Sequence, residues 1–190
     1  MMYLFFDTET TGLPKDYNAP AKNTDNFPRV VQLAWVLISD QQERIASGNH
    51  IIKPEGFEIP EESSKIHGIT QVIALEKGEP LKDVLKTFAK AIIDADVLVA
   101  HNINFDWKVM GAEFYRAGVP MYLDDIQKLC TMMSTINFVQ APGSYGFKYP
   151  KLVELHKKLF DCDFEGAHDA SNDIEATIKC FWKLKDMQLI

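Results

Sequence analysis

Residues 3–12 have the sequence YLFFDTETTG, a short apolar and aromatic run that ends in two acidic residues and a Thr-Thr-Gly turn signal. Such a run predicts a strand buried in a sheet. Asp7 and Glu9 stand two positions apart at its end, so their side chains leave the same face of the strand and can reach one ion. Acidic pairs at strand ends are also typical of turns and helix caps, so this pair needs partners elsewhere in the chain.

The rest of the chain alternates strand and helix patterns after an antiparallel beginning. A polar loop at 14–28 leads to two β-branched runs that predict a hairpin, and from residue 60 helical spacing dominates. This order favours an α/β fold, a central mixed β-sheet flanked by helices, in a single domain over 1–190. The expected strands are 3–6, 30–38, 45–52 and 96–100. The expected helices are 61–66, 71–76, 80–93, 125–135, 151–160 and 169–187, with one more that follows the strand at 96–100 and ends at 116. A mobile loop is expected at 140–150.

Two further acids lie at the predicted starts of helices. Asp106 and Asp173 each stand four residues after a residue that favours helix caps, Asn102 and Asp169 respectively. This spacing places both carboxylates in the first turn of a helix. The helix dipole stabilises an acid there, so either residue alone has an ordinary structural explanation.

Taken together, the four acids form a convergent set of oxygen ligands for Mg²⁺ or Mn²⁺. Two such ions about 4 Å apart polarise a phosphodiester and stabilise both the attacking and the leaving oxygen. His168 follows Gly166 and Ala167, which predict a flexible approach, and an imidazole there can accept a proton near neutral pH. The predicted metal ligands are Asp7, Glu9, Asp106 and Asp173, and the predicted base is His168.

The formal net charge of −7 is unusual for a chain that binds nucleic acid, because phosphates attract lysine and arginine. Two divalent cations in the acidic cluster would invert the sign locally and attract a phosphate. No signal peptide and no apolar run of about 20 residues is readable in the sequence. A cytoplasmic protein that does not bind membranes is expected.

Three separated motifs resemble the DnaQ-like, DEDDh 3′-to-5′ exonucleases: FDTETTG at 6–12, HNINFD at 101–106 and HDASND at 168–173. Within that family they look most like the proofreading ε subunit of bacterial DNA polymerase III, and IHGI at 66–69 is similar to the family's helix-turn element. The resemblance implies a ribonuclease-H-like fold and two divalent cations. It also implies release of nucleoside 5′-monophosphates from single-stranded or frayed DNA 3′ ends, in proofreading or repair.

The resemblance also implies roles for individual residues. Asp7, Glu9 and Asp173 are expected at one metal, Asp7 also at the second with Asp106 mainly through water, and His168 as general base. Leu13 is expected to wedge the last bases, and Phe105 to lie beneath the terminal base or to anchor the core. The residues expected at the substrate are Thr8, Thr10, Leu13, His101, Asn102 and Phe105, with His101 also expected to support the Asp106 loop.

Several alternatives stay open. The same metal chemistry serves RNA-directed exonucleases of the oligoribonuclease and ribonuclease T branches, although Thr10-Thr11 looks more like the DNA-directed branch. A non-catalytic binding module would be expected to lack a ligand, and a haloacid-dehalogenase-type phosphatase has no role for HDASND. It also stays open whether a DNA polymerase is a partner. The loop at 14–28 is longer than in the ε subunit, and the sequence ends at Ile190 without a tail for docking a polymerase.

Overall fold

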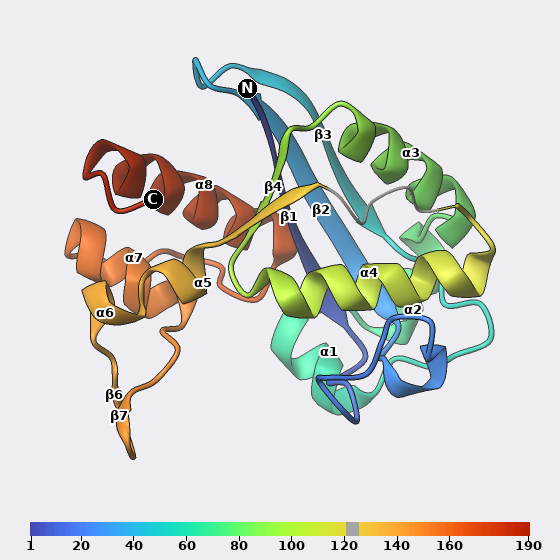
Figure 1. Cartoon of the computed structure of the whole chain (residues 1–190). Coiled ribbons are helices and arrows are strands. Elements are labelled where there is room, and N and C mark those ends of the chain that lie inside the picture. Colours follow the sequence, from blue (N-terminus) through green and yellow to red (C-terminus); the bar gives the residue numbers. More distant parts are fainter. Residues whose placement is uncertain (121–125) are drawn as a thin grey trace.

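A computed structural model describes residues 1–120 and 126–190 and contains a five-stranded mixed sheet with the order β3-β2-β1-β4-β5 (Figure 1). β1 lies at the centre, antiparallel to β2 and parallel to β4, which is parallel to β5. The expected α/β fold with a mixed sheet is confirmed. The strands are β1 (Met2–Thr10), β2 (Val30–Ser39), β3 (Arg44–Ile51), β4 (Val97–Ala100) and β5 (Gln127–Cys130), with a small hairpin of β6 (Pro142–Gly143) and β7 (Gly146–Phe147).

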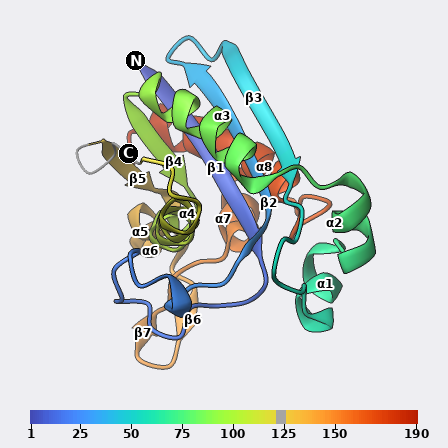
Figure 2. The same cartoon turned by 90° about the vertical axis from the view of Figure 1, so that its right-hand side faces the viewer.

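Helices cover both faces of this sheet (Figures 1 and 2). α3 and α4 lie on one face and α8 on the other, while α1 and α2 follow β3 in the chain. The helices are η1 (Thr24–Asn26, 3-10), α1 (Glu61–His67), α2 (Gln71–Lys77), α3 (Leu81–Ile93), α4 (Ile103–Ala117), α5 (Thr131–Ser134), α6 (Ile136–Val139), α7 (Leu152–Phe160) and α8 (Ala170–Asp186). None of these helices is long and apolar enough to cross a membrane.

The central strand β1 is buried on both faces because its apolar side chains alternate. Leu4 and Phe6 pack into the core beneath α3 and α4, whereas Tyr3 and Phe5 pack against α8. Phe5 meets Phe181 of α8 edge to face, with ring centroids 5.1 Å apart, and each such buried side chain contributes roughly 1.5–3 kcal/mol. This packing fixes the C-terminal end of β1, which carries the acidic pair, between two helical layers.

The structure differs from the predicted elements mainly after residue 120. The expected helix at 125–135 begins outside the described residues, and 127–130 form the edge strand β5 instead, followed by the short α5. Val99 and Leu129 share the parallel register of β4 and β5, so tertiary pairing overrides the local helical pattern. The loop at 140–150 contains the β6–β7 hairpin, and the loop at 14–28 contains η1.

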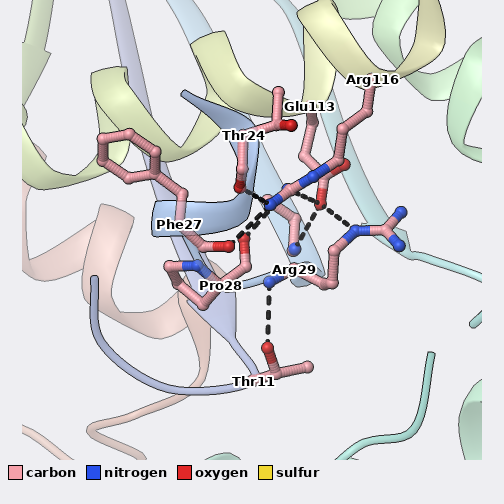
Figure 3. A network of polar contacts seen from close by, with 8 residues as sticks. Thr11, Thr24, Phe27, Pro28, Arg29, Glu113 and Arg116 are labelled. Atoms are coloured by element: carbon pink, nitrogen blue, oxygen red, sulfur yellow. Dashed lines mark hydrogen bonds and ion pairs between the residues drawn. The ribbon is translucent and has the colours of Figure 1, made fainter. Parts of the chain in front are cut away.

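The loop at 14–28 is fastened to α4 by a polar network (Figure 3). Glu113, 1% exposed, accepts through Oε1 from Arg29 Nε at 2.8 Å and from the Val30 amide at 3.0 Å, and it forms an ion pair with Arg116 at 3.1 Å. Arg116 also donates to the backbone carbonyls of Thr24, Phe27 and Pro28. One buried carboxylate therefore joins two arginines and the start of β2.

Glu113→Ala is expected to lower the free energy of unfolding by about 3–5 kcal/mol, because it leaves two partly buried guanidinium groups without their acid. Chemical denaturation followed by circular dichroism measures this loss. Glu175→Ala is the matched control, since it breaks the exposed ion pair with Arg44, and such pairs contribute only about 0–1 kcal/mol. Equal losses in the two variants would contradict a structural role for the buried network.

Candidate active site

Asp7 and Glu9 lie within β1 itself, which is longer than the expected 3–6. Asp7 is paired with Ala34 and Glu9 with Gln32 of β2. Ala34 packs on the α8 side of the sheet, so the alternation of the strand directs Asp7 and Glu9 towards the start of α8. The two carboxylates therefore share one face, as the spacing predicts.

Asp106 reaches the same strand from the other face, in the first turn of α4. Its Oδ1 accepts from the Thr8 hydroxyl at 2.7 Å and from the Thr8 amide at 3.1 Å. The carboxylate is only 3% exposed. Thr8 therefore links the strand of Asp7 and Glu9 to the helix of Asp106. This structural role is separate from the substrate contact expected for Thr8.

Asp173 and His168 come from the start of α8. The Asp169 side chain caps this helix by accepting from the amides of Ser171 and Asn172, as its sequence position predicts. The His168 amide donates to Asp173 Oδ2 at 3.2 Å. Asp173 therefore lies in the first turn of α8, and His168 is held directly beside it.

The turn before α8 is held by hydrogen bonds, whereas Gly166 and Ala167 were expected to give a flexible approach. Asn172 Nδ2 donates to the Gly166 carbonyl at 3.2 Å, and the Asp169 amide donates to it at 3.3 Å. Gly166 and His168 both adopt a left-handed backbone, with φ of +74° and +69°. A non-glycine residue in this conformation is uncommon and typical of functional sites.

The four acids perturb one another, which shows that they converge. Burial raises the pKa of Glu9 to about 8, and Asp173, Asp106 and Asp169 add to the rise. Burial raises the pKa of Asp106 to about 7 despite the opposing hydrogen bonds from Thr8, and burial raises the pKa of Asp173 to about 6. The pKa of Asp7 is raised well above its ordinary range, first by burial and then by Asp106 and Asp173.

The donor set fits divalent cations. Asp173 Oδ1 is buried and has no hydrogen-bond partner among the described residues, and a buried acceptor in that state needs a cation or a donor. Ligand atoms of Glu9, His168 and Asp173 all lie within 4.8 Å of one another. Carboxylate oxygens are the ligands that Mg²⁺ and Mn²⁺ prefer. Asp7, Glu9, Asp106 and Asp173 are therefore the residues that would hold the metals.

The raised pKa values predict a specific pH dependence of stability without metal. Acids whose pKa is higher in the folded chain stabilise it below their ordinary pKa, near 4, and this contribution is lost as the pH rises through the folded pKa. For Asp173, Asp106 and Glu9 that loss begins above about pH 4 and is complete near pH 6, 7 and 8 respectively. In EDTA the melting temperature is expected to fall across this range, and Mg²⁺ or Mn²⁺ to restore it most at pH 8. Thermal melts at pH 5, 6.5 and 8 measure this; an equal metal effect at every pH would contradict it.

An apolar pocket of about 280 Å³ opens beside the acids. Four residues expected at the substrate line it, namely Thr8, Thr10, Leu13 and Phe105, together with Glu9. Leu13 is 72% exposed at its rim, and Phe105 is partly buried and also packs against the main core. Phe105 therefore lies both on the wall of the pocket and against the core.

Three lining residues come from α1 and were not predicted: Ser63, Ile66 and His67. His67 Nδ1 accepts from the Ile69 amide at 3.1 Å. Burial lowers the pKa of His67, so the neutral ring carries its hydrogen on Nε2, which is buried without a partner among the described residues. The resemblance at 66–69 pointed to this region of the chain, but nothing in the IHGI pattern indicated that the side chains of Ile66 and His67 face the pocket.

His101 and Asn102 lie apart from the pocket lining. His101 Nε2 lies 2.9 Å from the Pro150 carbonyl and Nδ1 lies 3.0 Å from the Thr131 hydroxyl. A carbonyl only accepts, so Nε2 carries the hydrogen, and burial lowers the pKa of His101 to about 4. His101, which follows β4, is thus connected to the first residue of α5 and to the segment before α7. Asn102 was expected to cap α4, yet its backbone is left-handed and its side chain makes no capping hydrogen bond.

Comparison with known proteins agrees with this geometry. Residues 4–181 match the family model RNase_T, described as "Exonuclease". The chain is 29% identical over 175 residues to the PolC-type DNA polymerase III of Lactococcus lactis and 32% identical over 178 residues to that of Streptococcus sanguinis. Each match covers 92% of this chain, but the chain spans only about a tenth of the length of these relatives (9% and 10%).

Solved structures show the same fold. Escherichia coli Exonuclease I in complex with a dT13 oligonucleotide superposes with a TM-score of 0.76 at 22% identity. The zinc-bound form of its single-stranded DNA complex gives 0.78 at 23% identity. Each covers 98% of this chain and 41% of the other. The expected DnaQ-like, ribonuclease-H-like fold is therefore confirmed.

Proposed function

This chain belongs to the RNase_T family of exonucleases, and we propose that it removes nucleotides from the 3′ end of DNA by metal-dependent hydrolysis. The observation that carries the proposal is the convergence of Asp7, Glu9, Asp106 and Asp173 beside an apolar pocket. Four carboxylates in one place favour a divalent metal site, and the adjacent pocket has room for a base. Hydrolysis of a terminal phosphodiester requires both features side by side.

The residues of the chain then have distinct roles. The four acids hold two divalent cations, which when bound supply a nucleophile and charge stabilisation at the phosphate. His168, exposed beside Asp173, accepts the proton of the attacking water. Leu13 and Phe105 hold the terminal base between an exposed and a partly buried apolar side chain. Thr8 keeps Asp106 in place through its two hydrogen bonds.

DNA is proposed as the substrate, with the similar proteins as support. The relatives are named as DNA polymerases III, and Exonuclease I was solved with single-stranded DNA oligonucleotides. We propose a role in proofreading or repair on single-stranded or frayed ends, with a DNA polymerase as a partner. Matched single-stranded DNA and RNA oligomers, labelled at the 5′ end and incubated with Mg²⁺ or Mn²⁺, test the substrate. Faster degradation of the RNA would replace DNA with RNA in this proposal.

The polarity of attack gives a further prediction. A 3′-terminal phosphate is expected to stop degradation, because it adds charge and bulk where the strand end must enter the pocket, whereas a 5′ block is expected to have no effect. A ladder of end-labelled products on a denaturing gel measures both. Circular single-stranded DNA is the control and is expected to remain intact. Cleavage of the circle would show an endonuclease.

A further inference from the structure

A second pocket, of about 440 Å³, lies away from the acids, between the residues after β3, the first turn of α3 and the last turn of α4. Its basic side chains outnumber its acidic ones on a chain whose formal net charge is −7. A local excess of cations on an acidic protein attracts anions to that place alone. The lining includes the basic residues Arg29, Lys53, Lys82, Lys86 and Arg116 and the acidic residues Glu55 and Asp83.

Two of these lysines are unpaired. Arg116 is engaged by Glu113 and three backbone carbonyls, and Lys86 Nζ lies 3.0 Å from Asp83. Lys53 and Lys82 are exposed and form no ion pair in the part of the chain that the structure describes. Their ammonium groups are therefore free to neutralise an anion in the pocket.

Arg29 adds an oriented donor. Its Nε is fixed on Glu113 at 2.8 Å, and its guanidinium carbon lies 4.2 Å from the centre of the Phe57 ring. Within residues 1–120 and 126–190 the two terminal nitrogens have no hydrogen-bond partner, and Figure 3 shows them directed away from the network. Because Glu113 and Phe57 already fix this guanidinium, it loses little conformational entropy when it binds an anion. Its two terminal nitrogens can donate to two oxygens of one phosphate.

Resting on the proposed function, we propose that this pocket binds a backbone phosphate of the strand, several nucleotides from the 3′ end that is being hydrolysed. A long strand and a free mononucleotide both carry a phosphate ester, so either could supply the phosphate that this pocket binds. Helix α4 favours the strand, since Asp106 lies in its first turn and Arg116 in its last. Ten residues of helix span about 15 Å, and a stacked strand advances about 3.4 Å per nucleotide, so the pocket lies about four nucleotides away.

The Arg29 backbone also connects the pocket to the catalytic strand. The Arg29 amide donates to the Thr11 hydroxyl at 2.9 Å, and the Thr11 amide donates to the Arg29 carbonyl at 2.9 Å. Thr11 directly follows β1, which carries Asp7 and Glu9. A strand held at both places would therefore lie over one continuous, hydrogen-bonded part of the protein.

Lys53→Gln/Lys82→Gln tests the proposal without touching the acids or the arginine network. For a 12-nucleotide single strand this variant is expected to raise KM and to reduce the slope of log KM against log salt by about 0.7, since the pocket neutralises one phosphate and each single-strand phosphate contact contributes about 0.7. A 3-nucleotide strand is too short to reach the pocket, so its kcat and KM are expected to stay at wild-type values. Lys77→Gln/Lys90→Gln is the matched control; both pairs of lysines are exposed and both variants carry a net charge of −9.

A second arm separates the two sources of phosphate. Thymidine 5′-monophosphate and inorganic phosphate are titrated in EDTA, and the rise in melting temperature is compared between wild type and the pocket variant. A rise that the variant lacks, together with an unchanged KM for the 12-nucleotide strand, would make this a mononucleotide site and overturn the strand proposal. Wild-type-like behaviour of the variant in both arms would overturn the pocket as a site. If the wild type degrades no strand, the proposed function fails, and a phosphate-dependent rise still reports on the pocket.

Discussion

Asp7→Asn is expected to lower the rate of single-strand degradation about 10³-fold or more at saturating Mg²⁺, while the chain stays folded. The metals contribute several kcal/mol to the transition state, and each 1.36 kcal/mol is a factor of ten in rate. Asp106, Asp173 and Glu9 each raise the pKa of the buried Asp7 carboxyl, so Asp7 lies close to all three of the other acids. Single-turnover rates on an end-labelled oligomer measure the loss.

The same substitution is expected to raise the melting temperature in EDTA. The folded chain disfavours the ionised form of Asp7, whose pKa is raised by burial and by neighbouring acids, so a neutral amide removes that penalty above the ordinary pKa of a carboxylate. Asp94→Asn, at the exposed end of α3, is the control and is expected to change neither quantity. Near wild-type turnover in Asp7→Asn would rule out the two-metal assignment, and loss of turnover through unfolding would show as a lower melting temperature.

The acidic site was predictable because it depends on local periodicity. The alternation of β1 placed Asp7 and Glu9 on one face, and the first-turn spacing placed Asp106 and Asp173 at helix starts. The cap at Asp169 was predicted correctly, because its side chain accepts hydrogen bonds from backbone amides only two and three residues later in the chain. Asn102 was wrong as a side-chain cap, since its left-handed backbone takes the side chain away from that geometry.

Features that depend on contacts between distant segments could not be predicted. β5 has little strand character in its own sequence and forms by pairing with β4. Ser63, Ile66 and His67 reach the pocket because α1 packs beside the end of β1, which no spacing within α1 reveals. The role of Glu113 likewise depends on a loop more than 80 residues earlier in the chain. Local sequence patterns were therefore enough to predict the acidic residues of the site. The residues that line its pocket and support its loops could be found only from the folded structure.

His168 tests whether the site works by proton transfer. His168→Asn is expected to lower the single-turnover rate about 10²- to 10⁴-fold, the usual contribution of a general base. Asparagine suits this test because it tolerates the left-handed backbone that His168 adopts at φ +69°, so the hydrogen bond from its amide to Asp173 is expected to persist.

The competing role for His168 is as a metal ligand, because its ring lies within 4.8 Å of ligand atoms of Glu9 and Asp173. The two roles separate by the dependence of rate on metal concentration. A base predicts an unchanged half-saturating Mn²⁺ concentration with a low maximal rate, whereas a ligand predicts a higher half-saturating concentration with a maximal rate near wild type. Glu165→Gln, an exposed substitution in the same turn, is expected to alter neither value. Since the acids alone already supply four carboxylates, the chemistry needs a proton acceptor more than a fifth ligand, which favours the first outcome.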